Sequence, residues 1–203
     1  MHRVRIQFGK TGPMRFTGHL DLAQAWERLL RRARVPVVYS KGFNPQPRLN
    51  LAAALPLGIT SECELIDIWL EAHVPAVDLL QRLTAAGPPG LTIHSVEEVA
   101  IKAPSLQSQL EAAEYDIVLI PLPKLEGRVD ALLAAVTLPR ARRGKSYDLR
   151  PLVLSIWHEA QGIGMQLAAR PGNTGRPDEV LLALGLDALA ARVHRTRLIF
   201  KLG

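Results

Sequence analysis

Polar and apolar residues alternate at the start of the chain. Residues 2–8, His-Arg-Val-Arg-Ile-Gln-Phe, have the period of two that is typical of a strand with one buried face. Over residues 21–33 the apolar positions recur at intervals of three and four, which places them on one face of a helix. Similar patterns predict strands over residues 37–39, 63–70 and 91–99 and a helix over 77–85. This β-α-β-β-α-β order is the split βαβ pattern of a ferredoxin-like domain.

The second half of the chain predicts the same order of elements. We expect strands over residues 115–119, 147–158, 163–169 and 195–202 and helices over 127–136 and 177–184. Residues 102–113 read as a linker, although no repeat is visible at the level of single residues. The predicted fold is therefore α+β, with two tandem ferredoxin-like (βαββαβ) domains that comprise residues 1–107 and 108–203.

Composition limits the classes of function that are open to the chain. Hydrophobic residues make up 48% of it, which is enough for a packed core, and no apolar run reaches the length of a membrane span. The single cysteine, Cys63, excludes an internal disulfide and a three-cysteine iron–sulfur site, and a Cys/His zinc site is excluded almost as firmly. We therefore expect a cytoplasmic protein without metal or cofactor. Trp26, Trp69 and Trp157 each occupy an apolar stripe and are expected in the core.

Charge is unevenly distributed along the chain. The net charge is +8 over residues 1–60, −8 over 61–136 and +6 over 137–203, within a total of +6. Basic segments of this kind favour a polyanionic partner such as RNA. The alternative is that the acidic middle of the chain pairs with its basic flanks inside the fold, and the sequence does not decide between the two.

The predicted first helix carries a group of arginines. Arg28, Arg31 and Arg32 share one face by their spacing, Arg34 follows them, and Glu27 is the only acid in the helix after Asp21. Guanidinium groups on one face suit phosphates because each donates two parallel hydrogen bonds. A solvated helix surface is the ordinary alternative.

The segment from Tyr39 to Arg48 is the best candidate for a binding surface. It combines two aromatic residues, two cations and an amide: Tyr39, Lys41, Phe43, Asn44 and Arg48. Stacking on aromatic rings together with nearby cations is how single-stranded RNA is bound without a deep pocket. The alternative is that Phe43 fills the core while the prolines stiffen a corner.

Three further residues lie just before the first helix. Arg15 and His19 are candidates to contact a phosphate or a base, and Asp21 is expected to be the N-cap of the helix. In the second half, Arg140, Arg142, Arg143 and Lys145 form a predicted basic hairpin tip. Asp148 and Arg150 are expected to have a structural role, paired with each other or with Arg176.

Several motifs resemble one known family. They are Met14–Asp21, Glu27–Ala33, Tyr39–Pro45, Leu55–Gly58, Asp148–Pro151, Arg176–Val180 and His194–Thr196. The chain resembles a bacterial module of unknown function that is fused behind cobalamin-binding radical SAM domains or acts as a separate partner of them. Gly18 and Gln46 differ from the serine and histidine expected there, and Gln46 argues against a metal in this loop. The resemblance implies a radical SAM enzyme as a partner.

From these patterns we expect a non-catalytic module that binds RNA, or an RNA-linked substrate, through a basic face. The expected contacts are Arg15, His19, Arg28, Arg31, Arg32, Tyr39, Lys41, Phe43, Asn44 and Arg48. One alternative is a metal-independent RNA endonuclease that resembles CRISPR repeat-processing proteins, with His19 and either Lys41 or Tyr39 as acid and base. Another is a protein-docking module for a radical SAM enzyme.

Overall fold

The computed structural model describes residues 1–121, 123–125, 127–142 and 144–201. These residues form two compact units, 1–109 (unit 1) and 110–203 (unit 2). The division lies two residues after the predicted boundary. None of the helices in this part of the chain is both long and apolar enough to cross a membrane.

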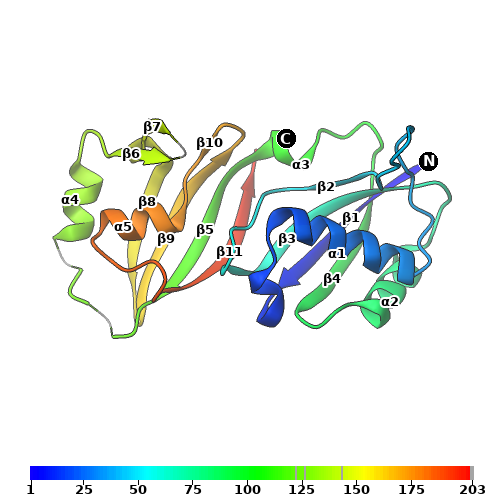
Figure 1. The fold of residues 1–203 in the computed structure, drawn as a ribbon, viewed down its shortest axis with the longest axis horizontal. Coiled ribbons are helices and arrows are strands. Elements are labelled where there is room, and N and C mark those ends of the chain that lie inside the picture. The colour runs from blue at the N-terminus through cyan, green and yellow to red at the C-terminus, as the bar shows by residue number, and fades with distance from the viewer. Residues whose placement is uncertain (122, 126, 143, 202–203) are drawn as a thin grey trace. The chain divides into compact units, whose positions relative to one another are not determined.

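Unit 1 is an antiparallel sheet with two helices on one face (Figure 1). Its elements are β1 (His2–Lys10), η1 (Gly12–Phe16), α1 (His19–Arg32), β2 (Leu49–Leu51), β3 (Thr60–Leu70), α2 (Ala76–Ala86), β4 (Leu91–Val99) and α3 (Leu106–Gln109). The strand order is β4-β1-β3-β2, and all three pairings are antiparallel.

The core of unit 1 follows from the alternation in β1. Val4, Ile6 and Phe8 point to the helix face of the sheet and are buried. Trp26 of α1 packs edge-on against Phe8, with 5.0 Å between the ring centroids, in the geometry that aromatic pairs prefer. The alternate residues Arg3 and Arg5 therefore face the other side of the sheet.

Unit 2 repeats the order of unit 1 with an added hairpin. Its elements are β5 (Leu110–Val118), α4 (Arg128–Ala134), β6 (Pro139–Arg142), β7 (Lys145–Asp148), η2 (Arg150–Leu152), β8 (Val153–Glu159), β9 (Gly162–Arg170), β10 (Asn173–Thr174), α5 (Pro177–Ala183) and β11 (Arg192–Phe200). Its main strands have the antiparallel order β11-β5-β9-β8. The α+β class is thus confirmed. The assignment of both units as tandem ferredoxin-like domains stays a prediction.

The structure corrects the predicted second strand of unit 1. Residues 37–39 form only isolated bridges, Val37 with Leu70 and Tyr39 with Pro47, and the strand is β2, Leu49–Leu51. Pro36, Pro45 and Pro47 lack the N–H groups that a continuous ladder needs, so pairing resumes only after them. The predicted strand 147–158 is likewise divided into β7, η2 and β8, with Pro151 inside η2.

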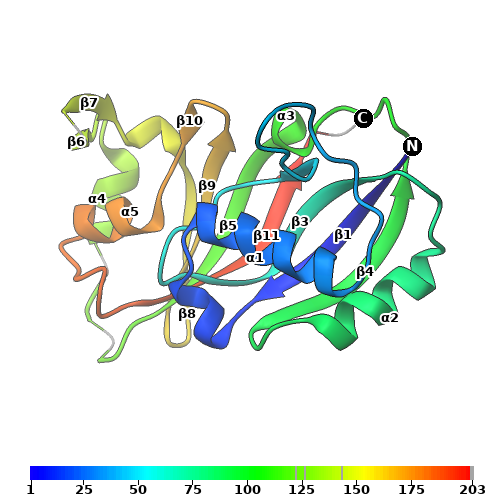
Figure 2. The same cartoon turned by 45° about the vertical axis from the view of Figure 1, so that its right-hand side comes forward.

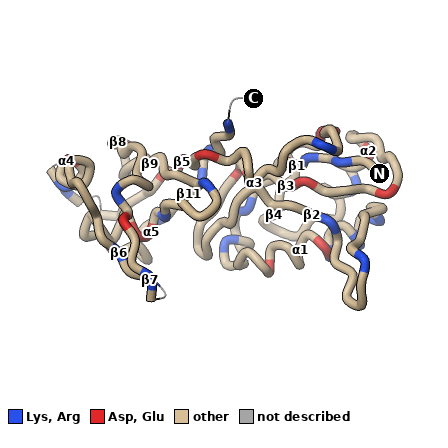
Figure 3. Tube along the Cα trace, turned by 90° about the horizontal axis from the view of Figure 1, so that it is seen from above, with Lys and Arg blue, Asp and Glu red and all other residues tan. Residues whose placement is uncertain are grey.

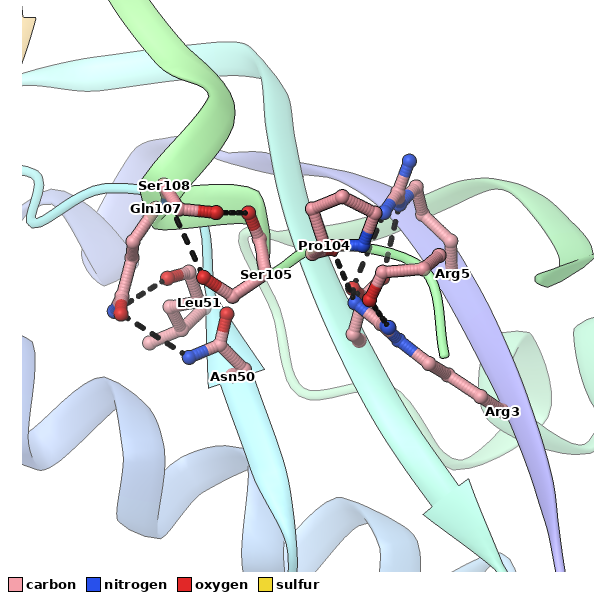
Figure 4. A network of polar contacts seen from close by, with 10 residues as sticks. Arg3, Arg5, Asn50, Leu51, Pro104, Ser105, Gln107 and Ser108 are labelled. Atoms are coloured by element: carbon pink, nitrogen blue, oxygen red, sulfur yellow. Dashed lines mark hydrogen bonds and ion pairs between the residues drawn. The ribbon is translucent and has the colours of Figure 1, made fainter. Parts of the chain in front are cut away.

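The linker predicted over residues 102–113 is also wrong. Arg3 donates hydrogen bonds to the carbonyl oxygens of Ala103 and Pro104, and Gln107 donates one to Leu51 O at 3.0 Å (Figure 4). Residues 106–109 then form α3, and β5 begins at Leu110. Residues 103–107 are therefore attached to the sheet of unit 1 by polar contacts.

Other elements differ from the prediction only in their end residues or in the burial of one side chain. α1 begins at His19 and not at residue 21, and β11 spans Arg192–Phe200, while residue 202 of the predicted strand lies outside the described residues. Trp26 and Trp69 are buried, as predicted. Trp157 is only half-buried: its ring covers Gly164 of the neighbouring strand, where a Cβ atom would lie 2.1 Å from it.

Candidate nucleic-acid interface

Residues 38–48 form an irregular hairpin that is anchored to β3. The backbone N–H of Val38 donates to Trp69 O at 2.8 Å, and Trp69 N–H donates to Arg48 O at 3.2 Å. Arg48 N–H closes the base of the hairpin by donating to Val38 O at 2.7 Å. The 38–48 hairpin is therefore held at its base by the sheet.

Two further bonds shape the hairpin above its base. Ser40 N–H donates to Gln46 O at 2.8 Å, and Gln46 N–H donates to the Ser40 hydroxyl at 2.9 Å. Gly42, with φ of +135°, supplies a conformation that other residues rarely adopt. Residues 41–45 form the tip, and every one of them is exposed.

The aromatic side chains of the hairpin face solvent. Phe43 at the tip has a relative exposure of 112%, and Tyr39 in the first arm has 40%. The alternative in which Phe43 fills the core is therefore wrong. Lys41 and Asn44 are exposed beside Phe43, and no described residue hydrogen-bonds or ion-pairs with either side chain. The tip thus presents a ring face, a cation and an amide together.

Arg48 contributes to the anchoring of the hairpin. Its guanidinium lies over the Trp69 ring at 4.5 Å from the centroid, and Arg3 also lies over that ring, at 4.9 Å. A second contact joins Arg48 Nη1 to Met1 Sδ at 3.8 Å. The cation–π contacts hold this end of the hairpin to β3.

The arginines of α1 lie on its exposed side, as their spacing predicted. Arg28 Nε donates to Gln24 O at 3.3 Å, and Arg31 forms an exposed ion pair with Glu27 at 2.9 Å. Across the described chain, no carboxylate pairs with Arg28 or Arg32. Figure 3 shows lysines and arginines in blue at several places along the trace.

The turn after α1 places another arginine in a strained conformation. Arg34 has φ of +52°, and it is the only described residue other than glycine with a positive φ. Arg34 N–H donates to Arg31 O and Val35 N–H donates to Leu30 O, which is the Schellman pattern that usually has glycine at this position. The helix therefore ends on an exposed cation where glycine is favoured on conformational grounds.

Arg15 and His19 lie at the opposite end of unit 1 from the hairpin. Both are exposed, Arg15 in η1 and His19 at the start of α1, whereas the hairpin follows the end of α1 (Figure 2). The 14 residues of α1 place His19 about 20 Å from Arg32 at 1.5 Å per residue. The base of the hairpin is bonded to Trp69 near the end of β3, whereas Arg15 is bonded to Gly58 just before β3. The structure thus groups Arg28, Arg31 and Arg32 with the connection that leads to the hairpin, and it leaves Arg15 and His19 apart from them.

Asp21 stabilises the start of α1, but not from the predicted position. The N-cap is Gly18, and the Asp21 carboxylate accepts a hydrogen bond from Gly18 N–H at 3.3 Å. Asp21 is therefore the third residue of the helix, and it contributes the side-chain half of a capping box.

Part of the acidic stretch pairs with basic residues inside each unit. The buried Asp67 accepts hydrogen bonds from both Arg3 and Arg5 in unit 1. In unit 2 Glu111 pairs with Arg170 and Lys201, and Glu114 with Arg197; this last contact raises the pKa of Arg197. These basic residues are thus neutralised within the fold. Among the ten predicted contact residues only Arg31 has a carboxylate partner in the part of the chain that the structure describes.

Tyr147, on the second strand of the basic hairpin of unit 2, has acidic neighbours in α5. Burial, followed by the charge of Glu179, raises the pKa of Tyr147 on β7, while Arg142 lowers it. The start of α5 therefore lies close enough to the β6–β7 hairpin for its carboxylates to act on it. Arg143, which belongs to the predicted tip, lies outside the described residues.

Asp148, Arg150 and Arg176 are structural, but their predicted pairing is wrong. Asp148 Oδ1 accepts hydrogen bonds from the backbone N–H groups of Leu138, at 2.7 Å, and Arg150, at 2.9 Å. The Arg150 guanidinium donates to the carbonyl oxygens of Leu133 and Val153. Arg176 forms a two-pronged pair with Asp178 instead.

Sequence reasoning missed two features of the interface. The sequence identifies Arg34 as a cation but does not show its positive φ. The one indication in the sequence is its position just after the end of a helix, where a left-handed residue is common. Trp69 is buried, as its apolar stripe predicts, but its ring is also the one on which Arg48 stacks, which the sequence does not indicate. Alternation along residues 65–69 places Trp69 on the same face as Asp67, away from the helices.

The chain matches a known protein family. Residues 3–177 match the family described as "Uncharacterized protein conserved in bacteria (DUF2344)". No curated protein matches the chain.

Proposed function

The chain belongs to this family of uncharacterised bacterial proteins, and we propose that it binds single-stranded RNA, or an RNA-linked substrate, through the 38–48 hairpin and the end of α1. In this proposal Phe43 and Tyr39 stack on bases, and Asn44 contacts a base edge. The exposed cations contact phosphates: Arg28, Arg31, Arg32, Arg34 and Lys41.

The single observation that carries the proposal is the full exposure of Phe43. An apolar ring at the tip of an anchored hairpin contributes nothing to the core. Its exposure forgoes the roughly 1.5–3 kcal/mol that burial of such a side chain contributes to stability. A π-face beside a cation without a carboxylate partner suits an unpaired nucleobase and its phosphate.

The same chemistry favours single strands over duplexes. In an A-form helix the bases are stacked on one another, so their faces are not available to a protruding ring. Cations alone would bind either form, since both present phosphates. Preference for unpaired RNA is therefore the expected signature of Phe43.

A radical SAM enzyme is the proposed protein partner. The motifs Met14–Asp21, Tyr39–Pro45 and Leu55–Gly58 support this through the resemblance described above, and one cysteine does not ligate a cluster by itself. In this proposal the chain presents the RNA-linked substrate and the partner performs the reaction. Co-purification that survives nuclease treatment would support a direct contact, and its loss with nuclease would contradict it.

The endonuclease alternative is not supported by the placement of its residues. His19 follows Arg15, whose carbonyl is bonded to Gly58 just before β3, whereas Tyr39 and Lys41 extend from Val38, which is bonded to Trp69 near the other end of that 11-residue strand. An acid and a base that act on one phosphate have to lie within hydrogen-bonding reach of it. A pairing of His19 with Tyr39 or Lys41 on one phosphate is therefore disfavoured.

Binding of a labelled 12-residue oligouridine, followed by fluorescence anisotropy, tests the proposal. Because base–aromatic stacking contributes about 1–3 kcal/mol, Phe43→Ala should weaken binding by about 5- to 150-fold. Phe16→Ala is the matched control, since Phe16 is also exposed and next to an arginine, at the other end of α1. It should leave the affinity unchanged.

A salt series and a duplex complete the test. If about three phosphates are contacted, the logarithm of the affinity should fall with a slope of about −2 against the logarithm of the salt concentration. A hybrid of the oligouridine with oligoadenosine should bind more weakly than the single strand. Absence of binding at low salt, or equal affinity for the wild type and Phe43→Ala, would overturn the proposal.

A further inference from the structure

Three large apolar side chains are exposed where β1 and η1 lead into α1. Phe16, Leu20 and Leu57 have relative exposures of 63%, 77% and 65%. We call them the apolar patch. They come from two of the motifs that carry the family resemblance, Met14–Asp21 and Leu55–Gly58, and the RNA proposal uses none of them.

Backbone contacts bring the two motifs together. Gly58 N–H donates to Arg15 O at 2.8 Å, which places Leu57 and Phe16 on adjoining segments. The Thr17 hydroxyl donates to Met14 O at 2.7 Å and fixes the turn into α1, where Leu20 is the second residue. Hydrogen bonds therefore hold the backbone that carries the three side chains in place.

The patch is exposed although both motifs also supply core residues. Met14 and Leu55 are buried, and they hold their segments against unit 1 while Phe16 and Leu57 point outward. Single exposed apolar residues are common on proteins, but three on adjoining segments are typical of an interaction surface.

Two polar side chains, the Arg15 cation and the His19 imidazole, border the patch. The Arg15 guanidinium lies over the Phe16 ring at 4.5 Å from its centroid, and His19 is exposed next to Leu20. Of the carboxylates that the structure describes, none pairs with Arg15 or His19, and Asp21 accepts its hydrogen bond from Gly18 N–H. A ligand for this surface thus needs apolar groups with carboxylates beside them.

We propose that the apolar patch docks an amphipathic, acidic helix of a partner protein. Leucine-like side chains of the helix cover Phe16, Leu20 and Leu57, one carboxylate on its flank pairs with Arg15, and another accepts a hydrogen bond from His19. A second copy of this chain is disfavoured because it would bring Arg15 against Arg15. RNA is disfavoured because Leu20 and Leu57 offer no ring on which a base stacks.

A pair of designed peptides tests the proposal. The first is a fluorescein-labelled helix of about 18 residues, or five turns, with leucines at i, i+4 and i+7 and glutamates on both sides of them. The second has lysine in place of each glutamate. Binding to the whole chain is measured by anisotropy at protein concentrations up to about 1 mM, so that complexes with a Kd of up to about 1 mM are detected.

The acidic peptide should bind at least about tenfold more tightly than the lysine peptide. Phe16→Ala and Leu57→Ser should each weaken its binding by about tenfold, as expected for central contacts. Phe43→Ala is the matched control and should have no effect. Arg15→Glu should reverse the preference between the two peptides, which a variant that merely unfolds would not do.

Four results would overturn the proposal. They are no binding of the acidic peptide, equal binding of both peptides, loss of RNA affinity in Phe16→Ala, and a sedimentation equilibrium dimer that Leu57→Ser abolishes. The first two contradict an acidic helix, the third assigns the patch to RNA and the fourth to a second copy. Phe43→Ala is the test variant for RNA and the control for the peptide, and Phe16→Ala is the reverse. Failure of the RNA proposal and failure of this one are therefore distinguishable.

Discussion

Both units carry a hairpin between their first helix and the next main strand, and the two hairpins differ. The 38–48 hairpin of unit 1 has an isolated bridge above its base and an exposed Phe43 at its tip. The β6–β7 hairpin of unit 2 has a regular four-residue ladder, and its aromatic residue, Tyr147, is half-buried. Both tips are basic. Charge alone therefore does not identify a binding surface, and the exposed ring is what distinguishes them.

The largest expected effect concerns the base of the second hairpin. Arg150 joins the end of α4 to the start of β8 through hydrogen bonds to Leu133 O and Val153 O. Arg150→Ala should lower the free energy of unfolding by about 2–4 kcal/mol, because partly buried carbonyls lose a charged donor. Urea denaturation measures this. The Arg140 side chain bonds, among the residues that the structure describes, only to the adjacent Pro139 O, so Arg140→Ala should cost under about 0.5 kcal/mol.

The turn before the first hairpin provides the second prediction. Arg34→Gly relieves a positive φ and should raise the free energy of unfolding by about 1 kcal/mol. It also removes a cation beside the hairpin, so binding of oligouridine should weaken. A variant that gains stability and keeps full RNA affinity would show that Arg34 has no part in binding.

The predicted elements that the structure corrects share a physical cause. Periodicity located β1, β3, α2 and β4 well, because their apolar positions face one packed core. It failed for residues 37–39 and 102–113, where the backbone bonds to distant carbonyls such as Trp69 O and where Arg3 binds Ala103 O. Such contacts join residues far apart in the chain and leave no periodic signal.

The candidate site was predictable only in its composition. The sequence identifies the ten residues by chemical type, as aromatic rings, one amide, one imidazole and several cations. Their division into one group at the start of α1 and another beyond its end depends on the fold. The sequence also does not show which basic residues the carboxylates neutralise. Asp67, Glu111 and Glu114 pair with arginines outside α1, so they do not neutralise Arg28, Arg31 or Arg32.

A smaller effect compares one cation from each hairpin tip. Lys41→Ala should reduce the slope of RNA affinity against salt by about one and weaken binding at low salt. Lys145→Ala, at the tip in unit 2, should change neither quantity. Equal changes in both variants would mean that the two tips bind RNA alike, and the comparison between the units would fail.

The smallest effect is confined to alkaline solution. Burial, followed by the charge of Glu179, raises the pKa of Tyr147 above its ordinary value of 10.0. The folded state therefore holds this proton more tightly than the unfolded state, and stability falls as the pH rises from about 10 toward the higher folded pKa. Tyr147→Phe should lose less stability over that range, as measured by thermal unfolding. Tyr39→Phe, at an exposed position, should follow the wild type.

The contacts of Arg3 with Ala103 and Pro104 have a consequence for how unit 1 is separated from the rest of the chain. The third residue of the protein touches residues a hundred positions later, so the two ends of unit 1 are neighbours. A fragment cut before residue 103 would leave Arg3 with fewer acceptors in a buried place, whereas one that continues through Gln109 retains them. Neighbouring ends also allow unit 1 to be closed by a short linker and reopened in a surface loop, as a circular permutant whose sheet is unchanged.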